Sequence, residues 1–360
     1  MSRFLDCQFG LSRFFSRTEY PMFDFAGQAS EHRQVNQDVA RGAMFGDYNS
    51  DGVMDYSYFT TGTDFNGVGI RLGTRPGEFG STRTTPWSSD TRDSEVHPGD
   101  FNGDGILDLL SLRSSRMFLG EGDGTFAKSF PAFGIDRVDG LGAIADFNLD
   151  GLPDLVAARA ATCGPRYFVA LANGDGTFEI SDDQLVASSF YGYAAMRIAD
   201  FYGDGYPDFM AKTSVERQID VHLNDPENPG TFQRSFRTIV TGQGTNVSHW
   251  DQSFVANDFT GDGIVDLAFA DDLSGEPMKL VVLAGDGLGA FTPAGESFVY
   301  DGIGTPGDID SADLNEDGHA DIVSFTTSGP RIHLGKGDGT FETTDTYPYS
   351  GTQQRGRDAT

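Results

Sequence analysis

Hydrophobic and polar positions follow the same order six times along the chain. In each unit an alternating stretch such as 143–145 leads into a polar loop, and a short apolar run such as Leu109-Leu110 or Ile322-Val323 follows at once. A second apolar run, a Gly-x-Phe turn and a polar–apolar stretch complete the unit. Short runs between turn residues predict β-strands, about four to a unit. The second runs are centred on Leu72, Leu119, Leu171, Leu223, Leu283 and Leu334, and the turns end at Phe79, Phe126, Phe178, Phe232, Phe291 and Phe341.

The repeat predicts an all-β fold built by radial repetition. Successive polar loops start 53, 46, 54, 58 and 55 residues apart. Four strands repeated around an axis form a β-propeller, in which closure of the ring hides most sheet edges. An open solenoid of such units would need capped ends, and no cap is evident. We therefore expect an all-β β-propeller of six four-stranded blades, with seven blades as the alternative.

The repeats also set the expected domain boundaries. We assign residues 36–350 to the propeller and residues 351–360 to a C-terminal tail. Residues 1–35 form an N-terminal extension or a partial blade, because Phe4-Leu5 and Phe14-Phe15 could supply one hairpin of a degenerate seventh blade. Only ten residues follow Ser350, too few to complete such a blade, which favours six.

Each unit carries a nine-residue loop with Asp at positions 1, 5 and 9 and Gly at position 6; the loops are residues 47–55, 100–108, 146–154, 200–208, 258–266 and 313–321. Three carboxylates this close repel one another unless a cation lies among them. Alternating oxygen donors suit calcium, which takes about 6–8 hard oxygen ligands. Glycine at position 6 permits the positive φ of a sharp turn. The pattern therefore predicts up to six Ca²⁺ ions, each a structural pin between the first two strands of a blade.

The expected ligands come from positions 1, 3, 5 and 9 through side chains and from position 7 through a carbonyl. The side-chain ligands are Asp47, Asn49, Asp51 and Asp55; Asp100, Asn102, Asp104 and Asp108; Asp146, Asn148, Asp150 and Asp154; Asp200, Asp204 and Asp208; Asp258, Thr260, Asp262 and Asp266; and Asp313, Asn315, Asp317 and Asp321. The carbonyl ligands belong to Val53, Ile106, Leu152, Tyr206, Ile264 and His319. Because Tyr202 is a poor ligand at position 3, the fourth loop is expected to be the weakest.

Charge and composition exclude some classes of function. The net charge of −29 argues against nucleic-acid binding, which needs a basic surface. No apolar run approaches the ~20 residues of a membrane-spanning helix. The two cysteines, Cys7 and Cys163, are too few for a disulfide framework, and both a single bridge and two unpaired thiols stay open. The first 20 residues lack the apolar core of a secretory signal, which leaves the export route open.

The aspartate loops and the Gly-Asp-Gly-Thr-Phe turns at 122–126 and 174–178 resemble the FG-GAP or VCBS-type repeat family, over roughly residues 36–350. The resemblance implies a calcium-binding propeller like those of integrin α-subunits and propeller lectins. It also implies an extracellular or cell-surface location, where calcium is abundant enough for sites that bind at about 0.1–1 mM. It does not imply one activity, because a fold hosts many functions.

Antiparallel connections place all the loops and Gly-x-Phe turns on one face of the ring. The opposite face then receives more varied segments, including His97, and loops on a rigid scaffold commonly carry function. Aromatic side chains stack on sugar rings, and arginine pairs with carboxylate or sulfate. Packing between blades and ion pairs with aspartates are the alternative roles for these residues. The candidate ligand-binding residues on that face are Trp87, Arg116, Tyr191, Tyr193, His249 and Trp250.

The sequence favours a recognition or adhesion module that binds a glycan or a protein partner. No nucleophile elbow, phosphate-binding loop or zinc motif occurs. A carbohydrate-active enzyme resembling a polysaccharide lyase is the first alternative, because Tyr191, Tyr193, His249 and Arg217 could supply a base and a cation. A structural component of a larger surface or toxin assembly is the second. Whether the chain is an enzyme therefore stays open, with a binding module preferred; the oligomeric state is also open.

Overall fold

The computed structural model describes residues 39–61, 66–75, 78–86, 96–112, 114–127, 129–134, 142–159, 166–180, 196–212, 218–239, 254–271, 279–294, 309–326 and 329–343. These residues form 24 β-strands and no helix. Accordingly, the described ranges hold no helix long and apolar enough to cross a membrane. The strands make six four-stranded antiparallel sheets, and within each sheet they pair in chain order. We number the sheets 1 to 6 along the chain.

The first three sheets span residues 39–180. Sheet 1 contains β1 (Val39–Gly46), β2 (Asp55–Thr61), β3 (Asn66–Arg75) and β4 (Glu78–Pro86). Sheet 2 contains β5 (Val96–Gly99), β6 (Asp108–Ser111), β7 (Arg116–Phe118) and β8 (Phe130–Pro131). Sheet 3 contains β9 (Gly142–Ala145), β10 (Asp154–Arg159), β11 (Arg166–Ala172) and β12 (Phe178–Ile180).

The other three sheets span residues 196–343. Sheet 4 contains β13 (Met196–Ala199), β14 (Asp208–Lys212), β15 (Gln218–Asn224) and β16 (Phe232–Ile239). Sheet 5 contains β17 (Phe254–Asn257), β18 (Asp266–Asp271), β19 (Lys279–Gly285) and β20 (Phe291–Pro293). Sheet 6 contains β21 (Ile309–Ala312), β22 (Asp321–Thr326), β23 (Gly329–Gly335) and β24 (Phe341–Thr343).

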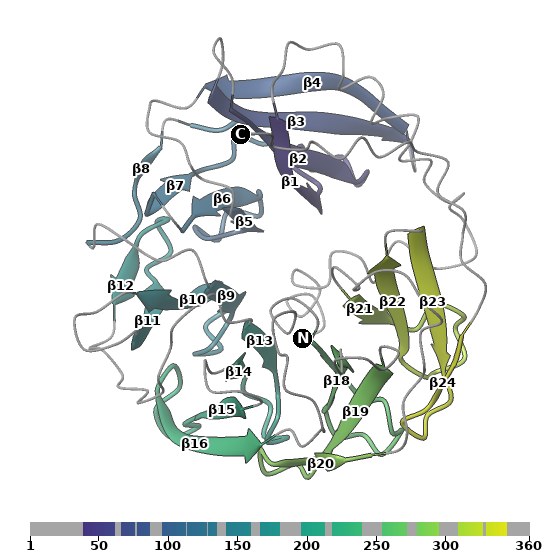
Figure 1. Cartoon of the computed structure of the whole chain (residues 1–360). Helices are drawn as coiled ribbons and strands as arrows, with labels where there is room; N and C mark the ends of the chain where they lie inside the picture. The colour runs from purple at the N-terminus through teal and green to yellow at the C-terminus, as the bar shows by residue number, and fades with distance from the viewer. Residues whose placement is uncertain are drawn as a thin grey trace, which may run out of the picture.

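The sheets are set around a common axis, with the first strand of each nearest the axis and the fourth at the rim (Figure 1). The apolar runs that follow the loops are the second strands, as predicted, and the predicted leucines lie in or directly beside the third strands. The all-β prediction with four strands to a unit is therefore confirmed. A seventh sheet from residues 1–35 would lie outside the described residues, as would the tail at 351–360.

The core lies between the sheets rather than inside any one of them. Successive residues of a strand point to opposite faces. The two apolar residues after each loop therefore pack toward two different neighbouring sheets. Leu109 packs in a cluster with sheet 1, whereas Leu110 packs in a cluster with sheet 3, and both are fully buried. Burial of one such side chain stabilises the fold by roughly 1.5–3 kcal/mol. The described residues form five clusters of this kind, one between each pair of consecutive sheets from 1 to 6.

An aromatic contact near the loops repeats between the same pairs of sheets. The residue at position 2 of a loop meets, edge to face, the phenylalanine that ends the Gly-x-Phe turn of the next sheet. Ring centroids in these pairs are 5.4 to 6.1 Å apart, the range in which aromatic pairs attract each other beyond simple burial. The pairs are Tyr48–Phe126, Phe101–Phe178, Phe147–Phe232, Phe201–Phe291 and Phe259–Phe341.

Candidate metal-binding loops and the opposite face

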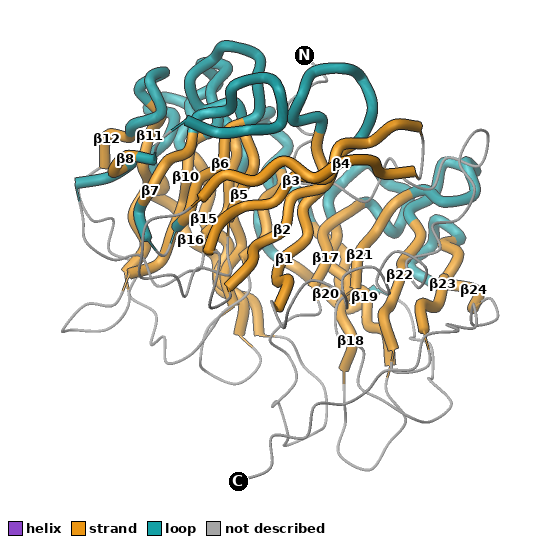
Figure 2. Tube along the Cα trace, turned by 90° about the horizontal axis from the view of Figure 1, so that it is seen from above, coloured by secondary structure: helices purple, strands orange, loops and turns teal. Residues whose placement is uncertain are grey.

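The six aspartate loops lie at the same ends of the sheets. In an antiparallel four-stranded sheet, the first-to-second and the third-to-fourth connections lie at the same end of the strands. Figure 2 shows most of the described loops gathered along one side of the molecule. This side, formed by the six loops and the turns before β4, β8, β12, β16, β20 and β24, is called the loop face below. The prediction that loops and turns share a face is confirmed for the described residues.

The second loop shows how the exposed positions are held. Asp100 accepts the backbone N–H of Asp104 at 3.0 Å through Oδ1 and that of Gly105 at 2.8 Å through Oδ2. Asp104 accepts the N–H of Ile106 and the side-chain amide of Asn102, both at 2.8 Å. The first, third and sixth loops repeat all four bonds at 2.8 to 3.1 Å. Four loops therefore share one arrangement of carboxylate and amide oxygen atoms.

Positions 4 and 6 of every loop adopt a left-handed backbone. The glycine at position 6 has φ between 82° and 94° in all six loops, as its presence at this position of every loop predicts. Position 4 is glycine in three loops, but Ser50, Leu149 and Glu316 take φ of 57°, 58° and 60°. A side chain in this region costs roughly 1–2 kcal/mol. Sequence reasoning missed the requirement at position 4, because half of the loops do not place glycine there.

The aspartate at position 9 joins its loop to the third strand. It is fully buried in all six loops. In the third loop, Asp154 accepts the N–H of Ala172 in β11 at 2.8 Å through Oδ1, and those of Phe147 at 2.9 Å and Asn148 at 3.3 Å through Oδ2. The other five make the same Oδ1 bond to the third strand or its end at 2.7 to 2.9 Å. Position 9 therefore has a structural role beyond any part in binding a cation.

Burial raises the pKa of these carboxyl groups. The pKa of Asp108, Asp154 and Asp208 is raised to about 7, first because burial disfavours the charged form. Backbone N–H bonds act in the opposite direction, and the other carboxylates of each loop add a smaller upward effect. The pKa of the remaining three, at Asp55, Asp266 and Asp321, is raised for the same first reason. A cation among the loop carboxylates would favour their ionised form.

The fourth and fifth loops depart from the common arrangement. They lack asparagine at position 3, so the amide bond to position 5 is lost. Asp200 instead accepts the N–H of Gly203, and Asp258 that of Gly261, each at 2.6 Å. The N–H groups of Tyr202 and Thr260 turn inward to position 9, at 3.0 and 2.8 Å. The loop with Tyr202 and its neighbour with Thr260 thus form a second class of loop.

The four loops with asparagine at position 3 carry the type of oxygen ligands that calcium prefers. Each supplies three carboxylates, an amide oxygen and a carbonyl, all hard oxygen ligands. Within the described ranges, however, no three acidic, histidine or cysteine side chains form a group that could hold a metal ion. The carboxylates face loop N–H groups in this arrangement. A carboxylate has about four lone-pair positions, so one or two N–H bonds leave room for a cation on the same oxygens.

We expect the metal-free protein to become less stable as the pH rises from about 6.5 to 8. Carboxyl groups with a pKa of about 7 when folded and 3.8 ordinarily hold protons only in the folded state in this range. Their contribution is therefore lost as the pH rises through 7. Burial lowers the pKa of His97 and His333 to about 4, which opposes this trend only below about pH 6.5. Melting temperatures of calcium-stripped protein at several pH values would measure the slope, and a rise across this window would contradict it.

Of the six candidate ligand-binding residues, only Arg116 lies in the described part of the chain. Its guanidinium donates to Ser129 Oγ at 2.8 Å and to the Ser129 carbonyl at 2.6 Å, which holds it against its own sheet. The assignment of His97 to a connection between blades on the opposite face was wrong. It lies in β5, paired with Leu110, because the innermost strand starts earlier than the sequence indicated. Trp87, Tyr191, Tyr193, His249 and Trp250 lie outside the described residues.

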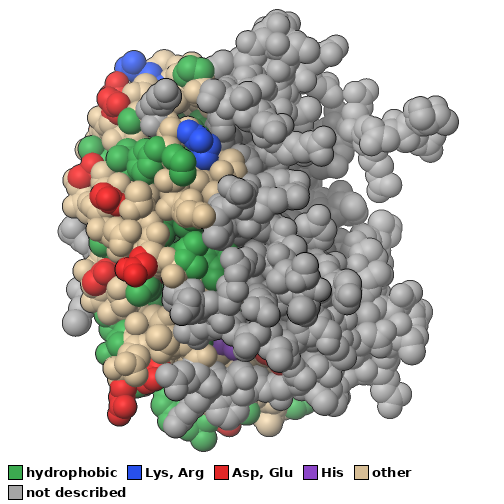
Figure 3. Space-filling view, turned by 90° about the vertical axis from the view of Figure 1, so that its left-hand side faces the viewer, with side chains coloured by type: hydrophobic (Ala, Val, Ile, Leu, Met, Phe, Trp, Pro, Cys, Tyr) green, Lys and Arg blue, Asp and Glu red, His purple; other side chains and the backbone are tan. Residues whose placement is uncertain are grey.

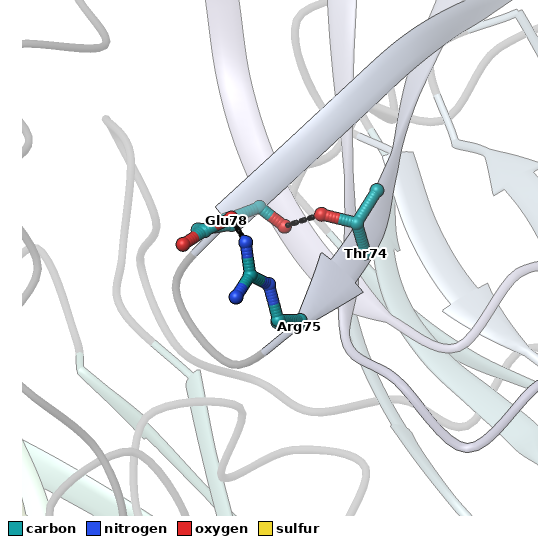
Figure 4. Close-up of polar contacts among 3 residues, drawn as sticks. All are labelled: Thr74, Arg75 and Glu78. Carbon is teal, nitrogen blue, oxygen red and sulfur yellow. Dashed lines mark hydrogen bonds and ion pairs between the residues drawn. The ribbon is translucent and has the colours of Figure 1, made fainter.

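Charged side chains occur at several places on the side shown in Figure 3. Figure 3 shows acidic groups at separate places on the described part of that side. At the third-to-fourth turn of sheet 1, Arg75 pairs with Glu78 at 2.8 Å, and the Thr74 hydroxyl donates to the Glu78 carbonyl at 3.3 Å (Figure 4). The Arg75 and Glu78 side chains are 73% and 58% exposed, so solvent screens the pair and it adds little stability.

The fold and the loops define an all-β repeat protein with one aspartate loop to each four-stranded sheet. The chain belongs to the FG-GAP-like repeat family, whose model matches residues 47–111, 146–211 and 258–324, more than half of the sequence. Each matched segment starts at the first aspartate of one loop and ends within or at the end of the second strand of the next sheet. The family resemblance seen in the sequence is thereby confirmed. No curated protein matches the chain.

Solved structures resemble the chain to different degrees. An Agrocybe aegerita lectin, described for its specific recognition of non-reducing terminal N-acetylglucosamine, has a TM-score of 0.62 and 18% identity, covering 86% of this chain and 79% of its own. A protein named AofleA from Arthrobotrys oligospora has a TM-score of 0.46 and 9% identity, covering 84% of both chains. A fucose-specific lectin from Aleuria aurantia has a TM-score of 0.43 and 11% identity, covering 88% of this chain and 97% of its own. Only the first score is high enough to indicate a shared fold.

Proposed function

We propose that this chain is a six-bladed β-propeller, stabilised by calcium outside the cell, that binds carbohydrate through the face opposite the aspartate loops. The observation that carries the proposal is the concentration of all six loops on one face, because the cation sites and a ligand site on the opposite face would then lie apart. A protein ligand on the same face is the alternative that the experiment below separates.

Calcium would be held by the aspartates at positions 1, 5 and 9, the oxygen at position 3 and the carbonyl at position 7. When bound, the ion would neutralise the loop and fix the turn between the first two strands of a blade. The four asparagine loops are the strong sites in this proposal. The loops at 200–208 and 258–266 are weaker, because their position-1 aspartates already close onto glycine N–H groups.

Carbohydrate binding is supported by the fold shared with the Agrocybe lectin and by the side chains assigned to the opposite face. That lectin recognises terminal N-acetylglucosamine, so glycans ending in this sugar are the first to test. A glycan array probed with the intact protein in calcium, and again in chelator, tests the proposal. Binding to a defined glycan supports it. No glycan binding, together with calcium-dependent melting, would reject the carbohydrate and direct the search to protein partners.

We expect Trp250→Ala to weaken binding of a glycan found on the array by at least about tenfold, as loss of a stacking aromatic at the centre of a binding surface does. Arg116→Ala should have a smaller effect, because the Arg116 side chain is bound to Ser129. Titration calorimetry with the free glycan measures both. Equal affinity of Trp250→Ala and the unaltered protein would remove Trp250 from the site, provided that their melting temperatures agree.

A further inference from the structure

Three asparagines of the chain are followed directly by glycine, and they lie in different kinds of structure. The pairs are Asn66-Gly67, Asn102-Gly103 and Asn173-Gly174. In such a pair the backbone nitrogen of the second residue can attack the side-chain amide of the first, an intramolecular reaction that needs close approach of the two groups. Glycine favours this approach because it has no Cβ and adopts many backbone conformations. An asparagine before glycine is therefore a candidate site of spontaneous deamidation.

Strand pairing and a closed turn restrain two of the three pairs. Gly67 is buried in β3, where it pairs with Thr60 of β2 and Pro86 of β4. The Asn173 side-chain amide donates to Thr177 Oγ1 at 3.0 Å across the Gly-x-Phe turn of sheet 3, and the Asn173 N–H donates to the Thr177 carbonyl at 2.9 Å. A rearrangement at either pair has to break the strand pairing or the bonds across the turn.

The pair Asn102-Gly103 lies in the second aspartate loop, where Gly103 and Asp104 are exposed. The Asn102 side chain makes its hydrogen bonds with Asp104 alone: its amide nitrogen donates to Asp104 Oδ2 at 2.8 Å, and its Oδ1 accepts the Asp104 N–H at 3.1 Å. The Gly103 N–H donates no hydrogen bond within the described part of the chain, whereas Gly203 and Gly261 at the same position donate to the first aspartate of their loops. The amide and the attacking nitrogen are therefore restrained only by contacts inside one exposed loop.

The residue at position 4 distinguishes the second loop from the other loops with asparagine at position 3. It is Gly103 in the second loop, and the corresponding residues of the first, third and sixth loops are Ser50, Leu149 and Glu316. All four loops hold the asparagine amide by the same bond to position 5, at 2.8 to 2.9 Å. A Cβ at position 4 hinders the approach of the backbone nitrogen to the amide, and only the second loop lacks one.

We propose that Asn102 is a site of spontaneous deamidation in the folded, calcium-free protein. The Gly103 nitrogen bonds to Cγ of Asn102, its proton passes to the side-chain amide, and the Cγ–Nδ2 bond breaks with release of ammonia. Water then opens the resulting cyclic imide at either of its carbonyl carbons. One product is aspartate, and the other is isoaspartate, in which the backbone runs through the side chain and is longer by one carbon. Neither step needs an oxidant, a reductant or a cofactor.

The two products have opposite consequences for the second loop. Aspartate adds a carboxylate at position 3, an oxygen ligand that suits calcium. Isoaspartate adds a backbone carbon between positions 3 and 4, which disturbs the spacing that lets Asp100 accept the N–H groups of Asp104 and Gly105. Deamidation therefore yields some molecules with a strengthened second loop and others with a disrupted one. This consequence for calcium rests on the proposed function, whereas the reaction itself does not.

Incubation of the full-length protein in chelator at mildly alkaline pH, followed by digestion and mass spectrometry of the peptides, measures the reaction at each asparagine. We expect Asn102 to deamidate at least about tenfold faster than the asparagines at position 3 of the first, third and sixth loops, a difference of about 1.4 kcal/mol in activation free energy. Asn102 should also react faster than Asn66 and Asn173 in buffer, although all three should react at similar rates in urea. Similar rates at the three pairs in buffer would overturn the proposal.

Calcium should slow the reaction at Asn102, because Asn102 Oδ1 is one of the ligands assigned to the second loop. This arm of the experiment alone rests on the proposed function. Equal rates at Asn102 in calcium and in chelator would count against an ion in the second loop, while the ranking of the asparagines in chelator would still decide whether Asn102 deamidates first.

Gly103→Ser is the matched variant, because it gives the second loop the residue that the first loop carries at position 4. Ser50 shows that serine takes the left-handed backbone of this position, with φ of 57°. In Gly103→Ser, the rate at Asn102 in chelator should fall to that of Asn49 in the same molecule. An unchanged rate would show that glycine does not direct the reaction and would overturn the proposal. If Gly103→Ser fails to fold, the asparagines of the three other loops give the same comparison in the unaltered protein.

Discussion

Removal of calcium should lower the melting temperature of this protein by about 8–18 °C. With about 5 mM free calcium and sites that bind at about 0.1–1 mM, each occupied loop stabilises the folded state by about 1–2 kcal/mol. Four asparagine loops together then contribute about 4–9 kcal/mol, and a domain of this size gains roughly 2 °C for each kcal/mol. Thermal melting in calcium and in chelator at pH 7.5 measures the difference.

Variants of single loops show whether this increment comes from the proposed sites. Asp104→Asn removes one charge from an asparagine loop and should abolish roughly a quarter of the increment, if four loops contribute equally. Asp204→Asn makes the same change in the fourth loop, where Tyr202 replaces asparagine, and should have a smaller effect. Asp104 is exposed and Asp204 is partly exposed. In chelator, both variants should therefore melt at the temperature of the unaltered protein. Equal melting temperatures in calcium and in chelator would refute calcium binding by the loops.

The strands, the loops and their common face could be predicted because each is encoded within a single repeat. Glycine at position 6, the leucine of the third strand and the phenylalanine of the turn recur at nearly fixed offsets, and each constrains its own neighbourhood. The contacts between repeats were not predicted. Phe101 and Phe178 are separated by a whole sheet of sequence, and their pairing depends on how one sheet packs on the next. The aromatic residue that recurs at position 2 was a usable signal, although nothing within a single repeat identifies its partner.

Two candidate residues show why side-chain roles are harder to predict than strands. Both were expected on the face opposite the loops, His97 in a connection between blades and Arg116 in a turn between a second and a third strand. Strand pairing places His97 opposite Leu110 inside sheet 2, whereas a serine thirteen residues away takes up the guanidinium of Arg116. Which face a side chain occupies depends on where a four-residue strand starts, and a shift of one residue reverses it. Pro98 and Gly99, residue types that are uncommon in strands, obscure this strand in the sequence.

The aspartates at position 9 were predicted as cation ligands, and the structure gives them a second role that can be separated from the first. Asp154→Ala should destabilise the protein by about 3–6 kcal/mol even without calcium. The substitution leaves the buried N–H groups of Ala172 and Phe147 without their acceptor at about 1–3 kcal/mol each, and the loss at the partly buried N–H of Asn148 adds a smaller cost. Denaturant unfolding of the calcium-stripped protein at pH 7 measures the change in the free energy of unfolding.

Asp150→Asn in the same loop is the matched control, because Asp150 is exposed and accepts N–H groups of its own loop only. In calcium-free buffer it should unfold like the unaltered protein, whereas in calcium it should lose the contribution of the third loop. Asp154→Ala should lose stability in both conditions. Asp154→Asn keeps one acceptor oxygen and should fall between Asp154→Ala and the unaltered protein. If Asp154→Ala were harmless without calcium, the buried carboxylate would be a cation ligand alone, and its bonds to the third strand would contribute no net stability.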